Sequence, residues 1–458
     1  DHHLGGMMRA STKFDFENRP VETVTAFSTP GTQTITKNYH YNNAGLISSI
    51  THKINSGSVV TLAQFGYDQL GSLTNKTFPV AGNAAMNFTY NIRGWMKKIN
   101  DPQVSNGTAD IFAQELFYES GSQFNGNIAK VEWRGKDDIK RVYYYTYDVA
   151  NRLKTANYTV PTFTSHNGRY NLGYINYDPN GNITTLQRVN QQSASIWAMV
   201  DNLAYSYVTN SNKLTNVHDN QTTNTYLSKD FKNLGTTAYI YNGNGNLTVN
   251  SDKNITSISY NHLNLPSNIT FSGTNKKIDY WYNAEGVKVR QVNTDGVNVN
   301  TIDYIGEFVF ENNAISYILH EEGRAAFESS AFQYEFFIKD HLGNVRQVVR
   351  APVSALRIAT MEPEKAAEEE EEFQNIKESR QGAGEHNITP GGYATAWLNA
   401  DRGRILGPSR SQEVQQGDSV ELGVFGKYVD PRKTRLHPVS FVRTGANTKM
   451  IQQLTEFG

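Results

Sequence analysis

The chain has 458 residues, and its 43 basic and 44 acidic side chains leave a formal net charge of −1. This balance excludes the strongly basic field that nucleic-acid-binding and polybasic membrane-surface proteins need. Cysteine is absent, which excludes disulfides, cysteine–zinc sites and thiol nucleophiles. The sequence has no run of about 18 or more apolar residues, so it does not predict a membrane-spanning helix.

The composition indicates many strands and many turns. Charged residues make up only 19% of the chain, whereas it holds 48 Asn, 36 Gly, 26 Tyr and 22 Phe. Tyr and Phe favour strands, while Asn and Gly favour turns. Hydrophobic residues make up 38%, which is enough for a core. We therefore expect short strands joined by tight turns.

A short pattern recurs ten times: an aromatic residue, Asp or Asn, two free positions, Gly or Asn, one free position, and an apolar residue. Imperfect copies start at Phe14, Tyr260 and Tyr282, and the last starts at Lys339. Longer intervals predict decayed copies, one of them at residues 205–214. The motif positions that we single out as structural are Tyr41, Gly45, Tyr67, Asp68, Gly71, Tyr90, Gly94, Tyr147, Asp148, Tyr177, Asp178, Gly181, Tyr241, Gly245, Tyr282, Gly286, Asp340, His341, Gly343 and Arg346.

Each position of the pattern has a physical reason. Asp or Asn suits the first position of a type I turn, because its side chain caps the backbone. Gly, or Asn in its place, adopts the left-handed conformation that closes a hairpin with a bulge. The residue two before the Tyr is usually large as well, so both lie on one face of a strand. Each copy therefore predicts a β-hairpin with an aromatic face that neighbouring hairpins must bury.

These copies resemble the YD repeats of the RHS family, which teneurins and the cocoon component of TC toxins share. Residues 336–346, with the sequence FFIKDHLGNVR, are similar to the signature of the RHS-associated core. The copies at Tyr90 and Tyr260 look like the version found in Bacteroidota. The resemblance covers roughly residues 10–350. It implies an all-β fold in which repeated hairpins wind into a spiral sheet, or shell, followed by a small β-sandwich-like segment.

Two departures from the family pattern limit what the resemblance implies. The array is short for a complete closed cocoon, so it represents part of one. Many family members cleave themselves at an Asp-Pro-x-Gly segment after the core motif. No such segment follows Val345, and Asp430-Pro431 continues as Arg432-Lys433. Self-cleavage is therefore not expected.

The sequence changes character after residue 350. An acidic run over residues 362–372 is interpreted as a solvated helix or acidic loop, with a cation site as the alternative. Alternating patterns predict strands at residues 393–398 and 419–425. Residues 356–430 look like the β-sandwich segment that follows the core motif in Bacteroidota RHS-like proteins. We therefore divide the chain into a repeat shell (1–350), an acidic connector with a sandwich-like module (351–430), and a tail or the start of a variable region (431–458).

No catalytic, cofactor-binding or metal-binding residue is expected. The pair Asp340 and His341 is interpreted as a turn element, since neighbours on a strand point to opposite faces. Capping explains the turns near Asp178 and Asp252 without a calcium ion. The sequence also lacks nucleophile-elbow, zinc-protease and Walker motifs. We therefore expect a protein that is not an enzyme.

The resemblance implies a secreted or cell-surface bacterial shell that encapsulates and carries a variable C-terminal effector or toxin. The expected partners are the protein's own C-terminal cargo domain, outside this chain, and secretion machinery or an immunity protein. Nucleic acid is not expected as a partner. The alternative is a cell-surface adhesin or glycan-binding protein that uses the 356–430 sandwich, a fold-level analogy.

Overall fold

Strands dominate the computed structural model of the chain. It forms two units, Asp1–Pro352 and Val353–Gly458, which we describe separately. The structure describes residues 5–28, 31–79, 82, 84–104, 111–119, 124–221, 230–231, 237–350, 356–382, 387–400, 403–412 and 420–427. The predicted tail at residues 431–458 lies outside these ranges.

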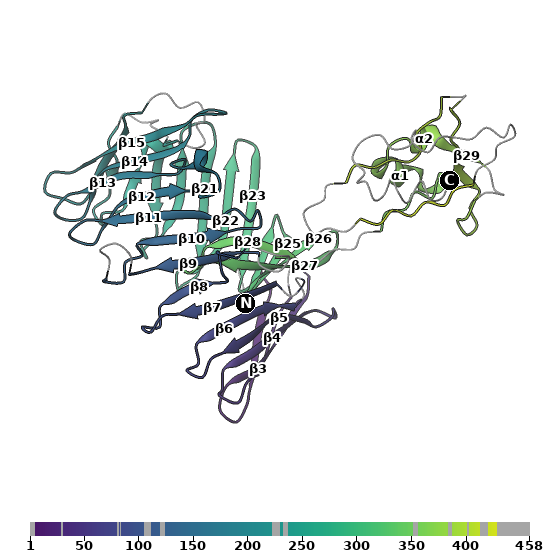
Figure 1. Cartoon of the computed structure of the whole chain (residues 1–458), viewed down its shortest axis with the longest axis horizontal. Coiled ribbons are helices and arrows are strands. Elements are labelled where there is room, and N and C mark those ends of the chain that lie inside the picture. Colours follow the sequence, from purple (N-terminus) through teal and green to yellow (C-terminus); the bar gives the residue numbers. More distant parts are fainter. Residues whose placement is uncertain are drawn as a thin grey trace. The chain divides into compact units, whose positions relative to one another are not determined.

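Within the described ranges, sixteen strands of the first unit form one sheet in which each strand pairs with the next along the chain (Figure 1). The pairing is antiparallel throughout, as successive hairpins require. The strands are β1 (Met8–Phe14), β2 (Pro20–Phe27), β3 (Gln33–Tyr41), β4 (Ile47–Ile54), β5 (Val60–Tyr67), β6 (Leu73–Phe78), β7 (Ala84–Tyr90), β8 (Met96–Ile99), β9 (Ala113–Phe117), β10 (Lys130–Arg134), β11 (Arg141–Tyr147), β12 (Leu153–Thr159), β13 (Leu172–Tyr177), β14 (Ile183–Gln191), β15 (Trp197–Tyr207) and β16 (Leu214–Asp219).

A short hairpin and a second large sheet follow. The hairpin consists of β17 (Ile240–Tyr241) and β18 (Leu247–Val249). In the part of the chain that the structure describes, the second sheet has ten strands, again paired in sequence order. They are β19 (Ile255–Tyr260), β20 (Pro266–Phe271), β21 (Lys276–Tyr282), β22 (Lys288–Asp295), β23 (Asn298–Ile305), β24 (Phe308–Glu311), β25 (Ala314–His320), β26 (Gly323–Glu328), β27 (Ala331–Lys339) and β28 (Val345–Arg350). The 3-10 turns Thr164–His166 and Ser251–Lys253 also lie between strands of the unit.

The predicted bulge is present at the repeat hairpins. The pairing register shifts by one residue at the motif aromatic, for example between His40 and Tyr41 and between Gly66 and Tyr67. The same shift precedes Tyr90, Tyr147 and Tyr177. A bulge of this kind lets a type I turn join two strands with the right-handed twist of a sheet.

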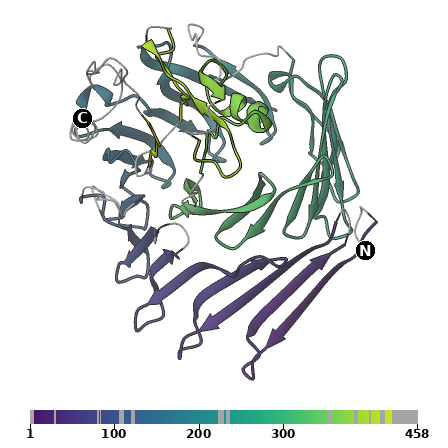
Figure 2. The ribbon, with the colours of Figure 1, turned by 90° about the vertical axis from the view of Figure 1, so that its right-hand side faces the viewer.

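Two hydrophobic clusters join the end of the second sheet to the beginning of the first. In one cluster, Phe336 and Ile338 of β27 pack among residues of β4–β8 such as Phe78, whose ring centroid lies 5.4 Å from that of Phe336. In the other, Phe27 of β2 packs on Phe308 of β24 with ring centroids 5.0 Å apart. In Figure 2 the green strands of the second sheet lie beside the purple strands of the first. The first unit therefore has a core formed by two sheets rather than by neighbouring repeats alone.

The second unit differs from the expected sandwich. Its described elements are the 3-10 turn Pro363–Lys365, α1 (Ala366–Glu372), α2 (Ile376–Ser379), β29 (Arg380–Gly382) and β30 (Ala394–Ala396), some of them labelled in Figure 1. The strand predicted at residues 393–398 is present as the shorter β30. No strand forms over the described residues 420–427, where Val420, Leu422, Val424 and Phe425 are exposed. An alternating pattern yields a strand only where another strand pairs with it, and no described segment does so here.

Of the two forms expected for the acidic run, a solvated helix or an acidic loop, the structure has a helix, α1, but Glu369 of this helix is buried. Glu369 of α1 is buried and accepts hydrogen bonds from the backbone N–H groups of Thr360 and Met361, at 2.7 and 3.1 Å. These donors account for its burial by ordinary hydrogen bonding. The carboxylate therefore fixes the entry of the chain into the helix.

The predicted fold class is confirmed for the first unit: it is all-β and consists of successive antiparallel hairpins in large sheets that do not close. The described residues include no helix that is both long enough and apolar enough to cross a membrane.

Candidate functional site: the repeat turns and the covered sheet face

The motif turns share one geometry, which the copy at Tyr177 illustrates. The backbone N–H of Asp178 donates to the carbonyl of Asn182 at 2.9 Å, and that of Gly181 donates to the carbonyl of Asp178 at 3.1 Å. The carboxylate of Asp178 accepts the Asn182 backbone N–H at 2.8 Å and the Asn182 side-chain amide at 2.8 Å. These side-chain and backbone bonds from Asn182 lower the pKa of Asp178.

The glycines of the motif occupy the left-handed conformation that the pattern predicts. Their φ angles lie between 75° and 89° at Gly45, Gly71, Gly94, Gly181, Gly245, Gly286 and Gly343. Asn18, Asn151 and Asn264 take the same position in their copies, with φ between 57° and 62°. Asn is the natural replacement because its short polar side chain tolerates this conformation better than others.

The motif tyrosines connect neighbouring repeats. Each hydroxyl donates to a backbone carbonyl at or just before the start of the outgoing strand of the preceding repeat, at 2.5–2.9 Å. The pairs seen among the described residues are Tyr41 to Pro20, Tyr67 to Ile47, Tyr90 to Leu73, Tyr118 to Met96, Tyr147 to Ile128, Tyr177 to Leu153, Tyr207 to Ile183, Tyr241 to Leu214, Tyr260 to Leu247 and Tyr282 to Pro266. We call this series the tyrosine ladder.

The tyrosine ladder also reveals two irregular copies. Tyr207 belongs to the hairpin of β15 and β16, where the sequence predicted a decayed copy. Tyr118 was not singled out, because the matching apolar residue, Ile128, lies ten positions further on in the sequence. The signal available in the sequence was Leu116 two residues before the tyrosine and the Asn127-Ile128 pair after it.

The core motif at the end of the array has the most heavily bonded turn acid. Asp340 is 5% exposed, and its carboxylate accepts bonds from the backbone N–H groups of Leu342 and Asn344 and from the Arg346 guanidinium at 2.7 Å. Burial alone would raise the pKa of Asp340, but the bonds from Asn344, Leu342 and Arg346 outweigh it and the pKa is lowered. His341 has its Nδ1 3.1 Å from the side-chain oxygen of Gln114 in β9. Asp340 thus bonds within the turn, while His341 contacts a strand of the first sheet.

Polar residues that the sequence did not single out lie between the two sheets. The buried Lys37 ammonium of β3 pairs with Glu307 and with Glu321, the latter at 2.9 Å. Lys76 of β6 pairs with Glu322 at 2.9 Å. The partners are separated by 246 to 284 residues in the chain, so no local pattern could have paired them. These ion pairs fix the second sheet on one face of the first, which we call the covered face.

Two buried histidines lie where the second sheet packs on the covered face. His52 of β4 is fully buried, and its Nδ1 lies 2.8 Å from the hydroxyl of Tyr334 in β27. His320, at the end of β25, lies with its ring centroid 5.9 Å from that of His52. Burial lowers the pKa of His52 to about 3 and that of His320 to about 4. Both rings are therefore neutral in the folded protein near neutral pH.

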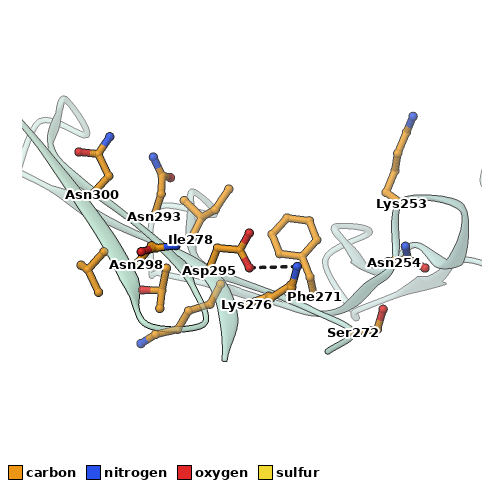
Figure 3. A pocket seen from close by; sticks show the side chains of 13 residues that line it. Lys253, Asn254, Phe271, Ser272, Lys276, Ile278, Asn293, Asp295, Asn298 and Asn300 are labelled. Carbon is orange, nitrogen blue, oxygen red and sulfur yellow. Dashed lines mark ion pairs between the residues drawn. The ribbon is translucent and has the colours of Figure 1, made fainter. Parts of the chain in front are cut away.

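A shallow pocket of about 530 Å³ lies on the hairpins of β19–β23 (Figure 3). Its lining is rich in amides, with Asn293, Asn298 and Asn300 beside Phe271 and Ile278. Lys276 and Asp295 form an ion pair at 3.0 Å across a hairpin end, and both are largely exposed. An exposed cross-strand ion pair of this kind is a surface feature.

Comparisons with known proteins give no family. No family model matches the sequence, and no curated protein matches it. Among solved structures, it is similar to TcdB2-TccC3 without its hypervariable C-terminal region (12% identity, TM-score 0.26) and to the Photorhabdus luminescens Tc holotoxin pore (12% identity, TM-score 0.25). Both alignments cover 75% of this chain and 23% of the toxin chain, so the chain spans about a quarter of those proteins.

A porin-like protein from Bacteroides uniformis is similar at 12% identity and a TM-score of 0.19, over 63% of this chain and 91% of that one. Similarities at this level carry no information on function. The class of protein is therefore defined by the fold itself: an all-β protein of hairpin repeats joined by a tyrosine ladder.

Proposed function

We propose that the chain is a non-enzymatic part of an RHS-type β-shell, secreted or displayed on a bacterial surface, that encloses and carries a variable C-terminal effector. The tyrosine ladder is the observation that carries this proposal. It bonds each hairpin to the one before it, through a side chain placed at the same motif position each time. A series of equivalent hydrogen bonds between successive hairpins is suited to a continuous wall rather than to a localised active site.

The core motif at the end of the array supports a role in carrying a following segment. β27 packs its Phe336 and Ile338 into the cluster with β4–β8, and His341 contacts Gln114 of β9. The polypeptide that follows this motif therefore leaves from strands packed on the covered face. In this proposal the wall acts by exclusion, and its partners are the cargo segment, the secretion machinery and an immunity protein.

The glycan-binding alternative is not favoured. It depended on a sandwich at residues 356–430, and the described part of that region holds two short helices and one two-stranded sheet instead.

Limited proteolysis of the product of the complete gene tests the proposal. The segment after residue 430 should resist protease while the hairpin unit is folded, and it should be cleaved once urea unfolds that unit. The intact protein should also show no hydrolytic activity. Equal cleavage rates before and after unfolding, or a gene product that ends near residue 458, would contradict the proposal.

A further inference from the structure

Three aspartates meet where the first sheet ends. Asp201 lies in β15, Asp219 is the last residue of β16, and Asp230 lies on the chain segment that follows. One carboxylate oxygen of each lies within 4.8 Å of the others. The antiparallel register of β15 and β16 pairs Leu203 with Asp219, which brings the two strand carboxylates to the same end of the sheet.

Asp219 has an oxygen that lacks a protein donor. The residue is only 3% exposed, and its Oδ1 accepts the backbone N–H groups of Asn202 and Gln221 at 2.8 and 2.9 Å. Its Oδ2 is buried, and no donor among the described residues reaches it. A buried carboxylate oxygen without a partner is costly. One oxygen of this same carboxylate lies in the group with Asp201 and Asp230, so a cation there would give the Asp219 carboxylate the partner that it lacks.

Asp201 has protein partners of its own, one in a neighbouring strand and one beside Asp230. Asp201 is 2% exposed, accepts the Phe231 backbone N–H at 2.8 Å and forms an ion pair with Arg188, which faces it in β14. Lys253 is a further basic group nearby, but its ammonium lies over the ring of Phe231, 5.6 Å from the centroid.

The ligand set selects the type of ion. Carboxylate oxygens suit hard cations such as calcium and magnesium rather than zinc or copper. Calcium binds oxygens at about 2.4 Å and so spans ligand oxygens up to about 4.8 Å apart, whereas magnesium at about 2.1 Å requires a tighter and near-octahedral arrangement. The carboxylate oxygens of the group lie within 4.8 Å of one another, which is inside the span that calcium allows, and calcium also tolerates irregular geometry better than magnesium.

We infer that Asp201, Asp219 and Asp230 form a binding site for one divalent cation, with calcium preferred. The ion ties the segment that contains Asp230 to the last two strands of the first sheet. It therefore stabilises the end of the sheet just before the hairpin of β17 and β18. This site does not depend on the proposed function, because a wall, an adhesin or an enzyme would gain the same stability from it.

Calorimetric titration of the chelator-treated chain with calcium chloride, and separately with magnesium chloride, tests the site. We expect one calcium ion per chain and a melting temperature that rises with calcium concentration, because a ligand that binds only the folded state stabilises it. Asp219→Asn should weaken calcium binding by about tenfold or more, since one of the carboxylate ligands is lost. Asp295→Asn, which changes an exposed acid of a surface ion pair, should bind calcium like the unmodified chain.

The outcomes that overturn the site are distinct. No saturable calcium binding by a folded chain, or unchanged binding by Asp219→Asn, would place any bound ion elsewhere, for example on the acidic helix. Tighter binding of magnesium than of calcium would overturn the assigned ion. If Asp219→Asn fails to fold, Asp230→Asn provides the second variant, because Asp230 lies outside the strands; unchanged calcium binding there would also reject the site.

Discussion

The residue that explains the repeat is the motif tyrosine. In the sequence its visible role is that of an aromatic residue on one strand face, but its hydroxyl has a second role. Tyr177 donates to the Leu153 carbonyl at 2.7 Å and so joins two hairpins whose backbones are not paired at that point. Phenylalanine would supply the same ring without this bond, which explains why the position is nearly always Tyr in this chain.

Tyr177→Phe therefore tests the tyrosine ladder. It removes one hydrogen bond and keeps the packing, so we expect a loss of about 0.5–1.5 kcal/mol in the free energy of unfolding. The matched control is Tyr174→Phe in the same strand, because Tyr174 is 59% exposed and lies outside the tyrosine ladder. Urea unfolding followed by tyrosine and tryptophan fluorescence measures both. Equal effects of the two variants would reject a specific role for the hydroxyl.

At the scale of elements, the hairpins could be predicted and their long-range packing could not. Turn chemistry acts within a few residues, so Asp178 and Gly181 were sufficient to predict a capped turn and a bulge. At the covered face, Lys37 forms an ion pair with Glu321, and His52 forms a hydrogen bond with Tyr334. A period-2 pattern shows that a strand has a face to bury, but it does not show which distant strand covers that face. The aspartates of the proposed cation site were not singled out because none of them occupies a position of the repeat motif.

The two histidines of the covered face predict acid sensitivity. An unfolded histidine has a pKa near 6.5, whereas burial lowers the pKa of His52 to about 3 and that of His320 to about 4. The mutual repulsion of the rings and the nearby Lys37 act in the same direction at His52, while Glu321 opposes them. Between about pH 6.5 and pH 4 the unfolded chain therefore binds protons that the folded chain does not. The free energy of unfolding should fall as the pH falls, by up to about 1.4 kcal/mol per pH unit for each ring.

The measurement is urea unfolding of the chain at a series of pH values from neutral down to pH 4. The double variant His52→Gln and His320→Gln should flatten the dependence, whatever it does to stability at neutral pH. The control, His262→Gln, changes an exposed turn residue and should leave the dependence intact. An unchanged slope in the double variant would show that other groups cause the acid sensitivity.

At the scale of the whole first unit, the last strands of the repeat array pack against the first strands. In a simple linear repeat protein each repeat contacts only its neighbours, so loss of the last repeats lowers stability in proportion. Here Phe336 and Ile338 of β27 complete the cluster around Phe78 and Phe88, which belong to strands near the start of the array. The last strands therefore act as part of the core for the first strands.

Two truncations distinguish a simple linear repeat protein from one in which the last strands form part of the core for the first strands. Removal of residues 353–458 should preserve the thermal transition of the first unit, because both of its clusters lie within residues 1–352. Removal of residues 329–458 deletes β27 and β28 and uncovers Phe78 and Phe88. Each large apolar side chain that loses its burial costs about 1.5–3 kcal/mol, and a domain is stable by only about 5–15 kcal/mol in total. We therefore expect the shorter chain to lose its cooperative thermal transition in circular dichroism and to bind a hydrophobic dye. A small drop in the midpoint of that transition, in proportion to the residues removed, would show that the remaining repeats fold without β27 and β28.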